Sequence, residues 1–200
     1  NPMYSSIYSQ FPQYFGDQPW TAGPVYVGAF VMFLFVLGCF IVKGPLKWAL
    51  LGATIFSVLL SWGKNFMGLT DFFIDYVPMY NKFRTVEMAL VIPGMVFPII
   101  AIWGLKEVLS ETVSDALLKR GLIAALAITG GLSLILWLMP SMLLDFRSSF
   151  DAQYQLPDWY YNALLMDRAS LASADALRSL VFILLGAALL FWFYTSKDRK

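Results

Sequence analysis

The chain has 200 residues, of which 59% are hydrophobic, 17% aromatic and 14% charged. Soluble domains are roughly 45–50% apolar and about 25% charged. This composition excludes a disordered chain and a collagenous or disulfide-rich scaffold, and a net charge of only +1 excludes a nucleic-acid binder. It predicts an all-α, polytopic transmembrane helical bundle.

Two residue types that carry much of enzyme chemistry are scarce in the chain. It has no histidine and a single cysteine, Cys39, which lies inside an apolar run. Histidine-based catalysis, disulfides and Cys/His zinc sites are therefore excluded, and we predict no metal site and no cofactor within the segment. Any chemistry must use carboxylate, lysine, arginine, tyrosine or backbone groups.

Five apolar runs are long enough to cross a bilayer, whose hydrocarbon core of about 30 Å needs about 20 helical residues. We predict that residues 1–23 form an outer loop and that residues 24–200 form a transmembrane domain. The predicted spans cover residues 24–42, 46–62, 88–105, 121–139 and 177–194. Because the chain opens with Asn1 rather than an initiator methionine, we expect it to be a segment of a longer protein.

Basic residues divide the connections into two sets, and cytoplasmic connections are enriched in Lys and Arg. One set holds eight basic residues tightly against the span ends, whereas the other spreads six over longer loops rich in aspartate. We therefore predict that the eight and the C-terminus are cytoplasmic, with residues 1–23, 63–87 and 140–176 outside. The eight are Lys43, Lys47, Lys106, Lys119, Arg120, Lys197, Arg199 and Lys200.

The outer loops are aromatic, and two of them contain predicted short helices at the membrane surface. In the second loop, Thr70 is placed to cap the N-terminus of a helix that ends before Pro78. In the third loop, Trp159, Leu164 and Leu165 form one apolar stripe at helical spacing. Both segments are therefore expected to lie on the membrane rather than across it.

Four polar residues mark the predicted entry into the fifth span. Ser173 followed by Asp175 is typical of a helix start, where a carboxylate faces the positive end of the helix dipole. Arg168 and Arg178 flank this pair. We expect Arg168, Asp175 and Arg178 to form an ion-pair network that anchors the span.

Three cations gather in the second outer loop against the positive-inside trend. Lys64 begins the loop, while Lys82 and Arg84 lie in the stretch YNKFRT before the third span. Arginine offers a bidentate fork to phosphate oxygens, so this cluster predicts a lipid-phosphate site. Two alternatives stay open. Either Lys82 and Arg84 merely anchor the loop by pairing with Asp71, Asp75 or Glu87, or the cations snorkel to the interface.

The first outer loop offers a second candidate contact. Asp17 and Gln18 lie between Gly16 and Pro19, and carboxylate and amide groups are common sugar ligands. A simple turn role for Gly16-Asp17 is the alternative, and these residue types favour it over the sugar contact. No pair of carboxylates has the setting that glycoside hydrolysis requires, so the catalytic residue stays unassigned.

Four stretches, in chain order, resemble the YfhO-type bacterial membrane proteins, especially the large versions from Bacteroidetes. Together they touch nearly the whole chain. Each motif is moderately specific, and the order of the four strengthens the resemblance. They are FGDQPWTAGPVYVGA (15–29), LLSWGKNF (59–66), YNKFRTVEM (80–88) and DRASLASADALRSLVFILL (167–185).

This resemblance implies the C-terminal membrane part of a longer protein with a GT-C-like glycosyltransferase architecture. Such a protein moves a sugar from a polyprenyl-phosphate carrier to an acceptor at the outer face of the bacterial inner membrane. By position, Lys82 and Arg84 would contact the carrier phosphate, and the catalytic acid would lie in an early outer loop outside this segment. The implied partners are membrane lipid, the remainder of the longer chain and possible envelope proteins.

A non-catalytic structural or assembly subunit of a cell-envelope complex is the alternative function. In that case the aromatic outer loops would contact protein rather than carrier lipid. A transporter is disfavoured, because transporters place ionisable groups near the bilayer midplane and the predicted spans have almost none.

Overall fold

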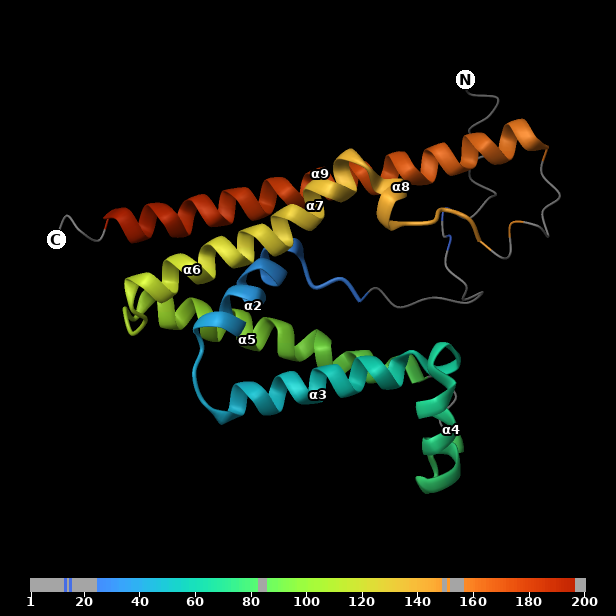
Figure 1. The fold of residues 1–200 in the computed structure, drawn as a ribbon, viewed down its shortest axis with the longest axis horizontal. Helices are drawn as coiled ribbons and strands as arrows, with labels where there is room; N and C mark the ends of the chain where they lie inside the picture. Colours follow the sequence, from blue (N-terminus) through green and yellow to red (C-terminus); the bar gives the residue numbers. More distant parts are fainter. Residues whose placement is uncertain are drawn as a thin grey trace.

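Every regular element in the described part of the chain is a helix. The computed structural model describes residues 13, 15, 25–82, 86–148, 151 and 157–196. Three helical segments are long and apolar enough to cross a membrane: Val86–Leu109, Asp115–Leu138 and Asp158–Ser196. They run back and forth along the long axis of the molecule (Figure 1). The chain is therefore an all-α membrane protein, as its composition predicts.

The elements follow one another with short connections. The first group is α2 (Ala29–Ile41), α3 (Pro45–Ser61), the 3₁₀ turn η1 (Gly63–Phe66) and α4 (Met67–Tyr76). The second is the 3₁₀ turns η2 (Tyr80–Lys82) and η3 (Val86–Leu90) with α5 (Val91–Leu109). The third is α6 (Asp115–Ala125), the π-helical turn η4 (Leu126–Gly130), α7 (Gly131–Leu138), α8 (Pro140–Leu143) and α9 (Asp158–Ser196).

Fewer helices can span a membrane than the five predicted. By length and composition the described residues contain three, or four if α3 and the bent continuation through η1 and α4 count as one span. α2 has only 13 residues, or roughly 20 Å of helix. It starts late because Gly28 has φ 95°, a left-handed backbone conformation, and it ends where Val42 becomes extended. α3 begins at Pro45, as predicted, but is followed by a 104° bend.

α9 is one continuous helix, which corrects two predictions. The expected surface helix around Trp159–Leu165 is the first part of α9, and Ser173 and Asp175 lie in its interior rather than at a start. Ser173 instead donates its hydroxyl to the Trp137 carbonyl at 2.7 Å, next to the end of α7. The 39 residues of α9 extend about 58 Å, against a hydrocarbon core of about 30 Å. The part of α9 that begins at Asp158 therefore projects beyond the membrane.

α4 confirms the predicted short helix in the second loop, which ends before Pro78. The predicted N-cap was wrong, however, because α4 begins at Met67, three residues earlier than Thr70. The Thr70 hydroxyl donates to the Gly63 carbonyl, seven residues back in η1, at 2.8 Å. Thr70 thus ties α4 to the bend after α3 and satisfies a backbone group there.

The short helix α2 lies at the centre of the bundle and packs against α5, α6 and α9 (Figure 1). Its Phe33, Leu37 and Ile41 are buried completely or nearly so. A close crossing holds it to α5, since a Cβ on Gly104 would lie 2.8 Å from the Gly38 Cα. Small residues at such crossings allow helix backbones to approach within van der Waals contact in membranes.

The described connections fall at two opposite ends of the bundle, as the two sets of basic residues require. The turns at residues 42–45 and 110–114 lie at the same end as the C-terminal end of α9 (Figure 1). The elements α4 and α8 lie toward the other end, which we call the outer end. That the outer end faces away from the cytoplasm stays a prediction.

Candidate functional site

The predicted lipid-phosphate residues lie around α4, at the outer end of α3. Lys64 is in η1 before α4, and Lys82 is in η2 after it, both exposed. The ten residues of α4 separate them by about 15 Å of helix. Arg84, Asp17 and Gln18 lie outside the described residues. The two lysines therefore flank α4 rather than forming one compact pair.

An apolar cavity of about 370 Å³ has Tyr80, two residues before Lys82 in the chain, among its lining residues. It opens between the end of α3 and η3, which are held together because the Ser57 hydroxyl donates to the Ala89 carbonyl. The hydroxyl oxygen of Tyr80, two residues before Lys82, is buried and has no hydrogen-bond partner among the described residues. The lining residues are Leu60, Tyr80, Val86, Met88, Ala89, Val91 and Ile92. The cavity and the buried Tyr80 hydroxyl thus lie together, and Lys82 follows Tyr80 in the same turn.

A buried ion pair organises the other half of the outer end, between α8 and α9. The Arg168 guanidinium on α9 donates to both oxygens of Asp151, from Nη1 at 2.8 Å and from Nη2 at 2.9 Å. The same Nη1 donates to the Phe146 carbonyl at 2.7 Å. The two side chains are 0% and 5% exposed. Arg168 therefore fastens the loop before α9 to the outer half of that helix.

The predicted network of Arg168, Asp175 and Arg178 was wrong in its partners. Arg178 pairs with Asp175 on the exposed surface of α9 at 2.5 Å, while Arg168 pairs with Asp151. Arg178 and Asp175 are three residues apart, a spacing that the sequence reveals. The partner of Arg168 lies 17 residues away in a loop with several aspartates. No local spacing singles out Asp151 among them.

The pKa of Asp151 lies below its ordinary value. Burial of the carboxylate raises the pKa, but this is outweighed by hydrogen bonds from Arg168 and the Ser148 N–H, by the Arg168 charge, and by the Tyr161 hydroxyl. A lowered folded-state pKa means that the unfolded chain binds the proton more tightly. The contribution of Asp151 to stability is therefore complete above its unfolded pKa of about 3.9 and is lost as the pH falls through the folded pKa.

We expect this pair to make the protein sensitive to acid. The apparent melting temperature should be insensitive to Asp151 ionisation near pH 7 and should fall as the pH drops below about 4. Thermal unfolding of the wild type and of Asp151→Asn, followed between pH 7 and pH 3, measures this. Asp151→Asn should start lower at pH 7 and lose less on acidification. An identical acid-side loss in both proteins would contradict the assignment.

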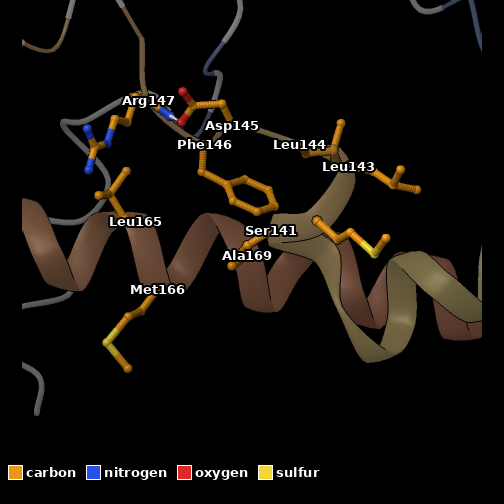
Figure 2. Close-up of a pocket in the computed structure, with 10 residues that line it drawn as sticks. Ser141, Leu143, Leu144, Asp145, Phe146, Arg147, Leu165, Met166 and Ala169 are labelled. Atoms are coloured by element: carbon orange, nitrogen blue, oxygen red, sulfur yellow. Dashed lines mark hydrogen bonds between the residues drawn. The ribbon is translucent and has the colours of Figure 1, made fainter.

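A groove of about 610 Å³ lies beside the Arg168 anchor, between α8 and the outer half of α9 (Figure 2). The Phe146 ring lies over the turn of α9 that carries Ala169, and the Asp145 and Arg147 side chains point to different sides of the loop (Figure 2). The lining residues are Ser141, Met142, Leu143, Leu144, Asp145, Phe146, Arg147, Leu165, Met166 and Ala169. The sequence did not predict this groove, because it joins segments about 20 residues apart.

Comparison with known proteins finds no matching family model, no matching curated protein and no matching solved structure for this chain. The resemblance to the YfhO-type proteins therefore rests on the four sequence stretches alone. Among the described residues, no group of three His, Cys, Asp or Glu side chains is placed to hold a metal ion.

Proposed function

We propose that this chain is the membrane segment of a YfhO-like glycosyltransferase that uses a polyprenyl-phosphate-linked sugar. It acts at the outer face of the bacterial inner membrane, and its C-terminus is cytoplasmic. The carrier phosphate binds at Lys82 and Arg84, with Lys64 on the far side of α4. The catalytic acid lies outside this segment, and Asp17 and Gln18 contact the sugar or the acceptor.

One observation carries the proposal, namely the apolar cavity at Tyr80, in the turn that also contains Lys82. A polyprenyl phosphate is a long apolar chain that ends in an anionic head. The cavity is lined almost entirely by apolar side chains, and exposed Lys82 is in the same short turn, η2, as the lining residue Tyr80. The buried Tyr80 hydroxyl has no partner and is therefore available to donate to a phosphate or ester oxygen. Cation, donor and apolar surface match the three parts of this ligand.

The polarity of the spans supports an enzyme of the outer face over a transporter. Residues 91–105, 121–138 and 179–196 contain no Asp, Glu, Lys or Arg. Transport of charged or coupled substrates generally requires such groups near the midplane. The charged side chains of the outer end are instead concentrated beyond the ends of α3 and α7, where a lipid headgroup would meet them.

The test is a titration of the purified full-length protein with undecaprenyl phosphate, read by thermal shift and by native mass spectrometry. Binding to the folded state raises apparent stability, so the wild type should melt at a higher temperature with carrier present. Lys82→Ala and Arg84→Ala should each weaken binding by about tenfold, because each removes a charge-assisted hydrogen bond to phosphate.

Lys119→Ala and Arg120→Ala are matched controls, since both side chains are exposed at the opposite end of the bundle. They should bind carrier like the wild type. If Lys82→Ala and Arg84→Ala fold and bind normally, the cluster is only a loop anchor. If even the wild type fails to bind, the transferase proposal falls.

The second candidate is a non-catalytic assembly subunit of an envelope complex. Trp159 and Met166 are large and exposed on the outer half of α9, seven or more residues further out than Ser173 at the end of α7. Exposed apolar groups outside lipid favour a protein partner. This function predicts envelope proteins that co-purify with the wild type and are lost when Trp159 and Met166 are changed to serine.

A further inference from the structure

We propose that the groove between α8 and α9 binds a membrane phospholipid whose head carries both a phosphate and a primary ammonium group, that is, a phosphoethanolamine head. Arg147 contacts the phosphate, and Asp145 contacts the ammonium group. This site is separate from the cavity at Tyr80 and does not depend on the proposed transferase activity.

The depth of the groove matches the headgroup layer. The Ser173–Trp137 hydrogen bond marks where α7 ends along α9. Ala169 and Leu165 are four and eight residues further out on α9, or about 6 and 12 Å along its axis. The headgroup layer extends roughly 5–8 Å beyond the hydrocarbon core on each side. The groove therefore begins at the membrane surface.

The groove is apolar on its membrane side and charged on its outer side. Met139, Met142 and Leu143 follow α7 directly and are 59%, 68% and 47% exposed, as lipid-facing side chains are. Asp145 and Arg147 come next in the chain and are also exposed. This order, from apolar to charged within nine residues, is the order of tail and head in a phospholipid.

The charges on the rim fit a zwitterionic head. Among the described residues, neither Asp145 nor Arg147 forms an ion pair, although they are only two residues apart. Asp145 Oδ1 accepts the Arg147 backbone N–H at 3.1 Å, which fixes the carboxylate while the guanidinium points elsewhere (Figure 2). Two opposite charges held apart complement a phosphate and an ammonium group joined by a two-carbon link.

The groove is formed in advance of binding because the loop that carries its charges is anchored. The carbonyl of Phe146, between the two charged residues, accepts a hydrogen bond from buried Arg168 at 2.7 Å. The Phe146 ring is itself only 6% exposed. A preorganised site loses less conformational entropy on binding than a mobile loop would.

Native mass spectrometry of the purified full chain with single added lipids tests this site. The probes are phosphatidylethanolamine, phosphatidylcholine and phosphatidylglycerol with the same acyl chains. The wild type should retain phosphatidylethanolamine best. Arg147→Gln should weaken that binding by about five- to tenfold, because it removes the bidentate contact to phosphate.

Asp145→Asn tests the contact to the ammonium group separately from the contact to the phosphate. It keeps an oxygen that can accept the Arg147 N–H but loses the charge that attracts ammonium. The preference for ethanolamine over choline should therefore disappear, while binding of both lipids persists. Arg120→Gln, exposed at the opposite end of the bundle, is the control and should bind like the wild type.

Three outcomes would overturn the proposal. Equal binding by the wild type and Arg147→Gln would remove the site. If the wild type binds phosphatidylethanolamine and phosphatidylcholine equally well, Asp145 does not recognise the ammonium group. A preference for phosphatidylglycerol would show a simple anion site instead of a zwitterionic one.

Discussion

Replacing Arg168 by methionine should lower the free energy of unfolding by about 3–5 kcal/mol, the largest effect we expect from a single substitution in this chain. Methionine keeps much of the volume but none of the donors. The Asp151 carboxylate, whose side chain is 5% exposed, would lose both guanidinium hydrogen bonds, and the Phe146 carbonyl would lose its donor. The cost arises because a buried charge and a carbonyl are left without compensation.

Lysine should rescue the substitution only partly. A lysine ammonium is a point charge, whereas the guanidinium fork reaches both Asp151 oxygens and the Phe146 carbonyl together. Arg168→Lys should therefore be more stable than Arg168→Met but less stable than the wild type. Replacing both partners by apolar residues should recover part of the loss, since no unpaired charge then remains.

Arg178→Met is the matched control for these variants. Arg178 is on the same helix and pairs with Asp175, but the two side chains are 65% and 58% exposed. Such surface pairs contribute about 0–1 kcal/mol. Unfolding in mixed micelles titrated with dodecyl sulfate compares the variants. If Arg168→Met loses no more stability than Arg178→Met, the buried pair is not an anchor.

Replacing Gly104 by alanine should destabilise the bundle by about 1–3 kcal/mol, the second largest effect. The added Cβ would lie 2.8 Å from the Gly38 Cα and 3.2 Å from the Gly38 N. Both are backbone atoms, so α2 and α5 would have to move apart. That movement would loosen contacts of the central helix α2, which also packs against α6 and α9.

Gly94→Ala is the matched control, because Gly94 is also on α5 and a Cβ there would meet nothing within 4 Å. Alanine is the better helix former, so this variant should be as stable as the wild type or slightly more stable. Thermal unfolding of both variants in the same detergent makes the comparison. Equal melting temperatures would show that α2 and α5 do not depend on a close crossing.

The sequence predicts the helices well where apolarity alone decides. The runs around residues 88–105, 121–139 and 177–194 all lie inside helices, and Pro45 starts α3 because proline suits a first turn. The short helix α4 was also predicted, since its aromatic and apolar residues stop before Pro78. In these segments local composition and tertiary environment require the same structure.

The sequence does not predict the helices correctly where a contact between residues far apart in the chain determines the structure. Residues 166–178 contain four charged residues, so the polar stretch resembles a break between two helices. In the structure it continues as helix because Arg168 is satisfied by Asp151 and Ser173 by the Trp137 carbonyl. Likewise, the predicted span of residues 24–42 does not reveal that, of its described residues 25–42, only Ala29–Ile41 are helical. The groove at Arg147 depends on the same long-range packing.

The continuity of α9 has a mechanical consequence. Sharp kinks in helices are almost always at proline, at Gly/Ser pairs or at π-bulges, and α9 contains no proline and a single glycine, Gly186. The helix therefore behaves as a stiff rod whose two ends tilt together. A ligand in the groove or a partner at Trp159 could displace the outer part of α9. Because the helix is stiff, its last turn, on the other side of the membrane, would then move in the opposite direction.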